Sequence, residues 1–155
     1  PLFAADNDGF VSMFNGRDLT GWTNINCAPE TWSVRDGMIH CTGKPTGALR
    51  TLRQYENFIL EVEWRHLEFG GNSGVFIWGT PISAPGVPFL RGIEVQVLDH
   101  GYAEKYKAKT GKDGPYFFST DGDVFPVGTS KMKPFEPTSP NGGRSFPRKK
   151  DGSMK

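Results

Sequence analysis

The sequence lacks three features that define large classes of protein. It has only two cysteines in 155 residues, too few for a disulfide-stabilised scaffold. No run reaches the roughly 18–20 apolar residues that span a membrane, and no long stretch has the periodicity of an amphipathic helix. A cysteine-rich scaffold, a membrane-spanning segment and a helical bundle are therefore not expected in this sequence. Cys27 and Cys41 are either a pair or buried free thiols.

The chain also has little net charge, +1, but the charged residues are unevenly distributed. Residues 1–100 contain 7 Lys or Arg against 11 Asp or Glu, whereas residues 101–155 contain 11 against 6. Nucleic-acid binding needs basic residues on a structured face with aromatic side chains. The basic triplet Arg148, Lys149 and Lys150 lies instead in a stretch rich in proline and glycine. We interpret it as a solvated loop and expect no nucleic-acid partner.

Glycine and proline are abundant, with 20 and 12 residues, and aromatic residues make up 13% of the chain. Without helical periodicity, this composition is typical of an all-β protein with many turns. A hairpin is predicted over 31–43, where Arg-Asp-Gly separates two short strands. Shorter strand signals lie at 116–119 and 123–127. Only loop-type sequence follows over 128–155, which favours a single, incomplete domain over 1–155.

The clearest alternation of polar and apolar residues lies at 58–69, FILEVEWRHLEF. In an extended chain, successive side chains point to opposite faces. One face of this predicted strand therefore carries Glu61, Glu63 and Arg65. The other face carries apolar residues, including Trp64, which we assign to the core.

Two further strands are predicted at 73–79 and 92–101. The first is apolar on both faces, as expected of a central strand. The second alternates and places Glu94 and Gln96 on one polar face. Ahead of them, the glycine-rich segment FGGNSG at 69–74 permits tight turns and close approach of the backbone.

Six blocks of the sequence occur in the order found in a known family. They are FVSMFNGRDLTGW, WSVRDGMIHCTG, FILEVEWR, GGNSGVFIW, GIEVQVLD and STDGDVFPV. Over about residues 10–147 the chain thus resembles the 3-keto-disaccharide hydrolase family, formerly a domain of unknown function. The resemblance implies a concanavalin A-like jelly-roll β-sandwich, often found in secreted or periplasmic bacterial proteins. Family members continue with strands that complete both sheets. We therefore expect this chain to form about the N-terminal two-thirds of the domain, with the remaining segment as its partner.

The resemblance also implies an activity on sugars already oxidised at C3. A ketone there acidifies the C2 proton, so one general base can remove it, and the enolate then expels the C1 substituent. Addition of water gives net hydrolysis of a 3-keto-glycoside or 3-keto-disaccharide. We expect Glu94 as base or metal ligand, Glu63 as its partner and Arg65 as the group that stabilises the enolate oxygen. His100 is an alternative base, because imidazole titrates near neutral pH.

The polar face of such a sheet suits a carbohydrate ligand, which needs hydrogen-bonding groups beside an apolar platform. The sequence offers Asn72, Ser73 and Gln96 for the hydrogen bonds, and Trp78 or Tyr102 for the platform. The alternative for the Asn-Ser pair is an ordinary turn that caps its own backbone.

The resemblance also suggests one divalent metal ion of unspecified identity, since carboxylate and imidazole groups together suit such ions. Its candidate ligands are Glu94, Asp99 and His100, all in or just after the 92–101 strand. The alternative for His100 is a polar surface residue at the end of a strand.

Two other functions are compatible with the sequence. Glu63 and Glu94 can form the carboxylate pair of a conventional glycosidase if their strands are neighbours. A non-catalytic, lectin-like carbohydrate-binding module has the same fold and the same groove. A perturbed carboxylate in the groove distinguishes an enzyme from such a module.

Overall fold

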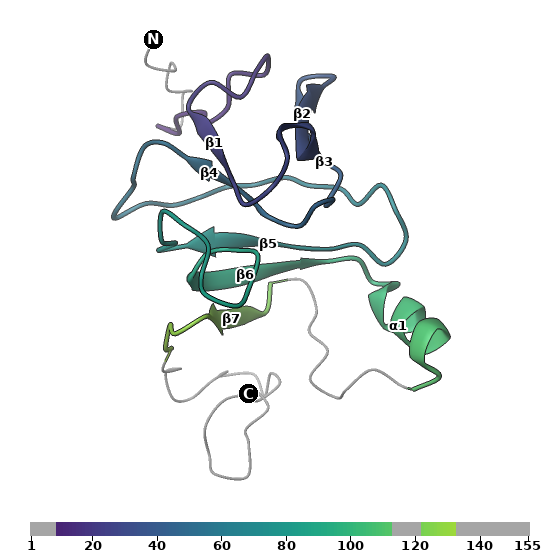
Figure 1. Cartoon of the computed structure of the whole chain (residues 1–155). Helices are drawn as coiled ribbons and strands as arrows, with labels where there is room; N and C mark the ends of the chain where they lie inside the picture. Colours follow the sequence, from purple (N-terminus) through teal and green to yellow (C-terminus); the bar gives the residue numbers. More distant parts are fainter. Residues whose placement is uncertain (1–8, 113–121, 133–155) are drawn as a thin grey trace. The chain divides into compact units, whose positions relative to one another are not determined.

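The structure is a computed structural model and describes residues 9–112 and 122–132. In this part of the chain it contains seven β-strands, one α-helix and one short 3-10 helix (Figure 1). Every strand pair is antiparallel, so the all-β prediction is confirmed, while the jelly-roll order of the strands stays a prediction. The chain divides into two compact units. The first runs to Val62 and includes Gly79–Arg91, and the second contains Glu63–Trp78 and continues from Gly92.

The first unit contains two short two-stranded sheets. They pair β1 (Trp22–Ile25) with β4 (Ala48–Thr51) and β2 (Trp32–Arg35) with β3 (Met38–Cys41). The 3-10 helix η1 (Pro29–Thr31) precedes β2. The β2–β3 pair is the predicted hairpin. Its turn residues Asp36 and Gly37 have positive φ angles of 50° and 71°, which a tight two-residue turn requires.

Both cysteines belong to the first unit, and both are free thiols. Cys27 is half-buried, and its Sγ accepts a hydrogen bond from the Trp32 indole Nε1 at 3.3 Å. Cys41 is exposed, because it ends the edge of the short β2–β3 hairpin. Of the two alternatives for these residues, free thiols are therefore observed, but the prediction of burial is wrong for Cys41.

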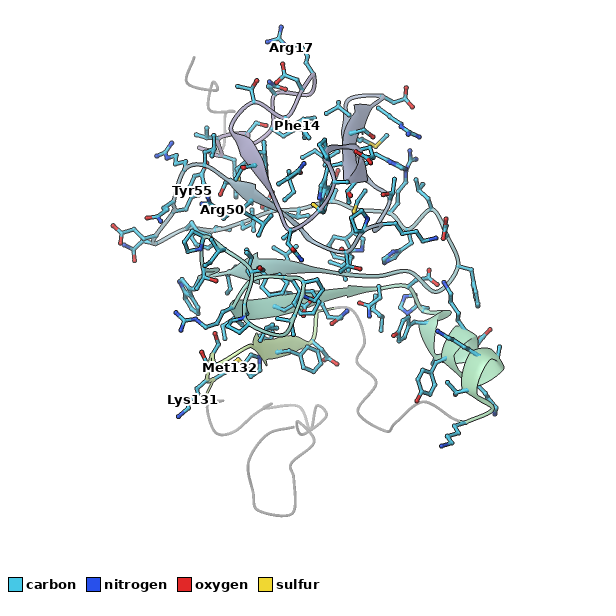
Figure 2. All side chains as sticks on the ribbon, viewed as in Figure 1. Phe14, Arg17, Arg50, Tyr55, Lys131 and Met132 are labelled. Carbon is cyan, nitrogen blue, oxygen red and sulfur yellow. The ribbon has the colours of Figure 1, made fainter. Side chains whose placement is uncertain are left out.

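A hydrogen-bonded loop precedes β1. The Asn15 side chain accepts the backbone N–H groups of Arg17 and Asp18 at 2.8 and 2.9 Å and donates to the Asp18 carboxylate at 2.7 Å. The backbone N–H of Thr20 donates to the same carboxylate at 2.9 Å. Hydrogen bonding from the Thr20 side chain first, then from the Asn15 side chain and then from the Thr20 backbone, lowers the pKa of Asp18 from 3.8 to about 2. Arg17 extends from the outside of this loop, whereas Phe14 turns inward (Figure 2).

The second unit contains a three-stranded sheet with β6 in the centre (Figure 1). Its strands, in spatial order, are β5 (Asn72–Ile77), β6 (Gly92–Leu98) and β7 (Val124–Val127). They confirm the strands predicted at 73–79, 92–101 and 123–127. The strand signal at 116–119 and most of the predicted loop at 128–155 lie outside the described residues.

Helix α1 (Tyr102–Thr110) follows β6 and was not expected from the sequence. None of its residues is buried, so it has no apolar stripe that a periodicity search would find. Its alanine, glutamate and lysine residues favour a helix by propensity alone. Gly111, with φ of 69°, ends it in the left-handed conformation common at helix C-termini. No helix within the described ranges is both long and apolar enough to cross a membrane.

Antiparallel pairing separates the two faces of the β5–β6–β7 sheet, because residues directly opposite each other point to the same side. One face is apolar and carries Val75, Ile77, Ile93, Val95, Val97 and Val124. Two of these side chains, Ile93 and Val97, are each 7% exposed. The opposite face carries Glu94 and Gln96, as predicted. The polar groups of the sheet therefore lie on the face opposite the valines, where Gln96 and Leu98 are nevertheless buried.

The strand predicted at 58–69 is not observed, and this prediction was wrong. Residues 58–66 belong to no strand, and 67–70 form a bend and turn. The apolar side chains assigned to the core are exposed, Trp64 by 51% and Val62 by 43%. Alternation defines two faces of an extended chain, but a strand also needs a neighbour that accepts its hydrogen bonds. Within the described residues, this segment has no such neighbour.

The Asp18 loop predicts a specific dependence of stability on pH. Because the folded state lowers the pKa of Asp18, its stabilising contribution is complete above the unfolded value of 3.8 and disappears as the pH falls through about 2. We expect Asp18→Asn to lower the melting temperature at pH 6, and the difference from wild type to shrink between pH 4 and pH 2. Glu56→Gln, at an exposed carboxylate, is the control. A difference that stays constant down to pH 2 would contradict this assignment.

Candidate functional site

The polar face of the β5–β6–β7 sheet is built around Glu94 on the central strand. Phe76 of β5 and Phe125 of β7 lie directly opposite Glu94 in the two neighbouring strands. Both aromatic side chains are half-buried. On the same face, Gly74 lies opposite Gln96. We call this surface, which carries Asn72, Gly74, Phe76, Glu94, Gln96 and Phe125, the Glu94 face.

Glu94 is a half-buried carboxylate with no charged or hydrogen-bonded partner among the described residues. Partial burial removes water from the charged form, and this desolvation raises the pKa of Glu94 above its ordinary value of 4.5. Its two phenylalanine neighbours on the adjacent strands supply apolar surroundings. A carboxylate with a raised pKa is a stronger base when ionised and a better proton donor when protonated. It therefore suits general acid–base chemistry.

Gln96 and Asn72 form an amide pair beside Glu94. The Gln96 Nε2 donates to the Asn72 Oδ1 at 2.6 Å and to the Ser73 backbone carbonyl at 3.0 Å. Gln96 is only 8% exposed, whereas Asn72 is exposed. A side-chain hydrogen bond of this kind contributes about 1 kcal/mol to stability. It also holds the Asn72 carbonyl toward Gln96 and leaves the Asn72 NH₂ group with no hydrogen-bond partner among the described residues.

Two predicted binding residues at β5 take different positions. Ser73 lies opposite Val97, so its side chain is on the apolar face and not on the Glu94 face. Trp78 follows the last residue of β5, next to the end of the sheet where β6 begins. It is 75% exposed and has a φ of 52°. A bulky residue in the left-handed region is strained, and such strain is concentrated at functional sites.

Asp99 has a structural role at the other end of β6. Its Oδ1 accepts the backbone N–H groups of Gly70 at 2.7 Å and Gly101 at 2.9 Å. Its own backbone N–H donates to the Gly71 carbonyl at 2.9 Å. The bonds from Gly70 first, and then from Gly101, hold the pKa of Asp99 below its usual value of 3.8. Asp99 thus joins the glycine-rich segment to the start of α1.

The glycines around Asp99 allow the backbone to pack closely. Gly70 has a φ of 67°, a conformation that side chains disfavour. A Cβ atom at Gly101 would overlap the ring of Phe69. The Lys105 Nζ from α1 donates to the Phe69 carbonyl at 3.1 Å. The first glycines of FGGNSG therefore serve the fold, whereas Asn72 and Ser73, for which a turn was the alternative, lie in β5.

The three predicted metal ligands do not lie together. Glu94 and Asp99 are five residues apart along an extended strand, which separates them by roughly 16 Å. Ligands of one divalent cation must each approach within about 2–2.6 Å of it. Among the described residues, no group of three or more His, Cys, Asp or Glu side chains is arranged to hold a metal ion. Glu94, Asp99 and His100 therefore do not fit a common ion, and no step below uses one.

Four other predicted site residues are not joined to Glu94. Glu63 and Arg65 are exposed in the segment that forms no strand, and neither forms a hydrogen bond or ion pair with Glu94 within the described part of the chain. His100 is exposed in the turn after β6, and Tyr102 begins α1. Glu94 lies near the start of β6, so these two residues are at the opposite end of the strand.

Sequence reasoning missed Gly74, Phe76 and Phe125 as members of the site. Their signals were present as a glycine inside a strand and two aromatic residues in strand-like runs. Which of them face Glu94 depends on the register between strands, which a single sequence does not reveal.

The partial burial of Glu94 predicts that its carboxylate lowers the stability of the folded protein at neutral pH. Because the folded state raises its pKa, the protonated form is favoured on folding, and stability is lost as the pH rises through the folded value. We expect Glu94→Gln to raise the melting temperature at pH 7, and this gain to disappear below pH 4.5. Glu68→Gln, at an exposed carboxylate in the preceding turn, is the control and should change little. A lower melting temperature for Glu94→Gln at pH 7 would contradict the desolvation argument.

Comparison with known proteins agrees with the carbohydrate interpretation. The model of a family described as a 3-keto-alpha-glucoside-1,2-lyase-like domain matches residues 9–142, most of the chain. This match confirms the resemblance drawn from the six sequence blocks. No curated protein and no solved structure shows significant similarity to the chain.

Proposed function

The chain belongs to the 3-keto-alpha-glucoside-1,2-lyase-like family, and on this basis we propose that it cleaves 3-keto-glycosides, including 3-keto-disaccharides. The observation that carries the proposal is Glu94, a half-buried carboxylate with a raised pKa and no partner among the described residues. A structural carboxylate at such a position would be paired, because burial without a partner costs stability. The absence of a partner for Glu94 among the described residues therefore favours a chemical role for this carboxylate.

The proposed reaction begins with removal of the C2 proton by Glu94. The C–H electron pair moves into an enolate whose negative charge lies on the C3 oxygen. The enolate then re-forms the ketone, and the C1–oxygen bond breaks to release the aglycone, which takes up a proton. Addition of water across the resulting C1–C2 double bond gives net hydrolysis. One base is enough for the first step, in keeping with a single perturbed carboxylate.

The neighbours of Glu94 have complementary roles in this proposal. The NH₂ group of Asn72, held by Gln96, donates a hydrogen bond to the C3 oxygen as charge develops there. Trp78 provides an exposed aromatic surface on which a sugar ring can stack. Arg65, expected from the sequence to stabilise the enolate, is exposed and forms no hydrogen bond or ion pair with Glu94 among the described residues, and in this proposal Asn72 takes that role.

Two rival functions give different results in one experiment. A glycosidase with two carboxylates needs a second acidic residue about 5–9.5 Å from Glu94, and Glu63 lies outside the paired strands. A binding module would not need an unpaired, desolvated carboxylate. Both rivals remain outcomes of the test.

The test is an NMR time course of a 3-keto-α-glucoside in D₂O with wild type, Glu94→Gln and the control Glu68→Gln. We expect aglycone release with deuterium entering at C2 for wild type and the control, and a rate lower by about 10²–10⁴-fold for Glu94→Gln. Release without C2 exchange would indicate the two-carboxylate glycosidase. Ligand broadening without turnover would indicate a binding module and contradict the proposed enzyme.

A further inference from the structure

Gly74 leaves open the space that the Glu94 side chain occupies. A Cβ atom at Gly74 would lie 2.5 Å from the Glu94 Cγ and 2.7 Å from its Cδ, and would meet its Oε1 as well. These separations are shorter than side-chain atoms tolerate, so any other residue would force Glu94 to move. The residue of β5 directly opposite Glu94 is Phe76, which lies two residues after Gly74. Its side chain therefore leans along the sheet, over the backbone of β5.

The glycine is needed here for space and not for its backbone freedom. Gly70 in the same segment has a positive φ, but Gly74 lies within β5 and its φ is outside the left-handed region. Alanine therefore fits the backbone at Gly74, and the three atoms that an added methyl group would approach most closely all belong to Glu94. Glycine inside a strand otherwise weakens it, so its presence at this position calls for a reason of this kind.

We propose that Gly74 is a positioning residue that lays the Glu94 carboxylate along β5, beside the amide pair of Asn72 and Gln96. Gly74 is the direct cross-strand partner of Gln96, whose Nε2 donates to the Asn72 Oδ1. A carboxylate over Gly74 thus lies on the same face as the Asn72 NH₂ group, two residues away along β5. The inference rests on the proposed role of Glu94 as the base, and it adds the reason why base and hydrogen-bond donor lie together.

This arrangement matters because the two groups act on adjacent atoms of the substrate. The base removes the proton at C2, while the donor stabilises charge on the oxygen at C3. If the carboxylate stands away from the sheet, it is further from the donor and better solvated. A misplacement of about 1 Å costs about 10²-fold in rate.

The kinetic test compares Gly74→Ala with Val75→Ala, which lies on the opposite, apolar face of the same strand. We expect Gly74→Ala to lower kcat about 10²-fold with little change in KM, because the substrate-binding groups stay in place. The acid limb of its pH–rate profile should move to lower pH as Glu94 becomes better solvated. Val75→Ala should lower the melting temperature without moving that limb.

A stability measurement tests the contact without any substrate. Gly74→Ala should lower the melting temperature in the wild-type background and much less in Glu94→Ala, where no side chain meets the methyl group. Should Gly74→Ala alone fail to fold, the double variant with Glu94→Ala should restore folding, because alanine lacks the Cγ and carboxylate that the methyl group would meet. Equal effects of Gly74→Ala in both backgrounds would overturn the inference.

The outcomes separate this inference from the proposed function. Unchanged kcat and an unmoved acid limb in Gly74→Ala, with Glu94→Gln inactive, would overturn the positioning role alone. Turnover that survives in Glu94→Gln would overturn the proposed function and the role of Gly74 with it. Loss of kcat together with the Glu94-dependent loss of stability would support both.

Discussion

The hydrogen bonding of β6 to β5 on one side and to β7 on the other fixes the arrangement of the second unit. Once this antiparallel register is set, each side chain is assigned to one of two faces. Ile93, Val95 and Val97 then lie on an apolar face, and Glu94 and Gln96 lie on the other. A shift of one residue would move the glutamate to the face of the valines and the valines to the face of the glutamate. The energy of burying the apolar face therefore also specifies where Glu94 is held.

Glycines have two different functions around this sheet. At Gly70 and Gly101 they permit close packing and a left-handed turn, which Asp99 stabilises by accepting both backbone N–H groups. At Gly74 the missing side chain leaves room for Glu94. The same short segment thus connects α1 to the sheet at one end and shapes the candidate site at the other. The two functions are distinguished by the φ angle of each glycine and by the atoms that an added Cβ would meet there.

The fold class was predictable from the sequence because turn residues and alternation are local signals. The β2–β3 hairpin, β5 and β6 were found in this way. The segment at 58–69 has the same alternation but no hydrogen-bonding neighbour in the described residues, and pairing is not a local property. Helix α1 escaped notice for the opposite reason, because a helix without a buried face has no hydrophobic period.

For the site, Glu94 and Gln96 were predictable from alternation on one strand. The Asn72 partner and the two phenylalanines depend on the register between strands, and Gly74 depends on a side-chain rotamer. The predicted metal cluster does not form among the described residues, because Glu94 is separated from Asp99 and His100 by most of an extended strand. Residues five or six apart lie close together in a helix or a turn, but not along a strand.

The proposed chemistry depends on Glu94 being a desolvated carboxylate that is unpaired among the described residues. This is tested most directly by a pH titration of its side-chain carboxyl ¹³C signal, assigned by comparison with Glu94→Gln. We predict a midpoint above 4.5, because partial burial disfavours the charged form and no partner among the described residues offsets it. A midpoint at or below 4.5 would show that Glu94 is well solvated or paired. In that case the carboxylate would lack the property on which the proposed chemistry rests.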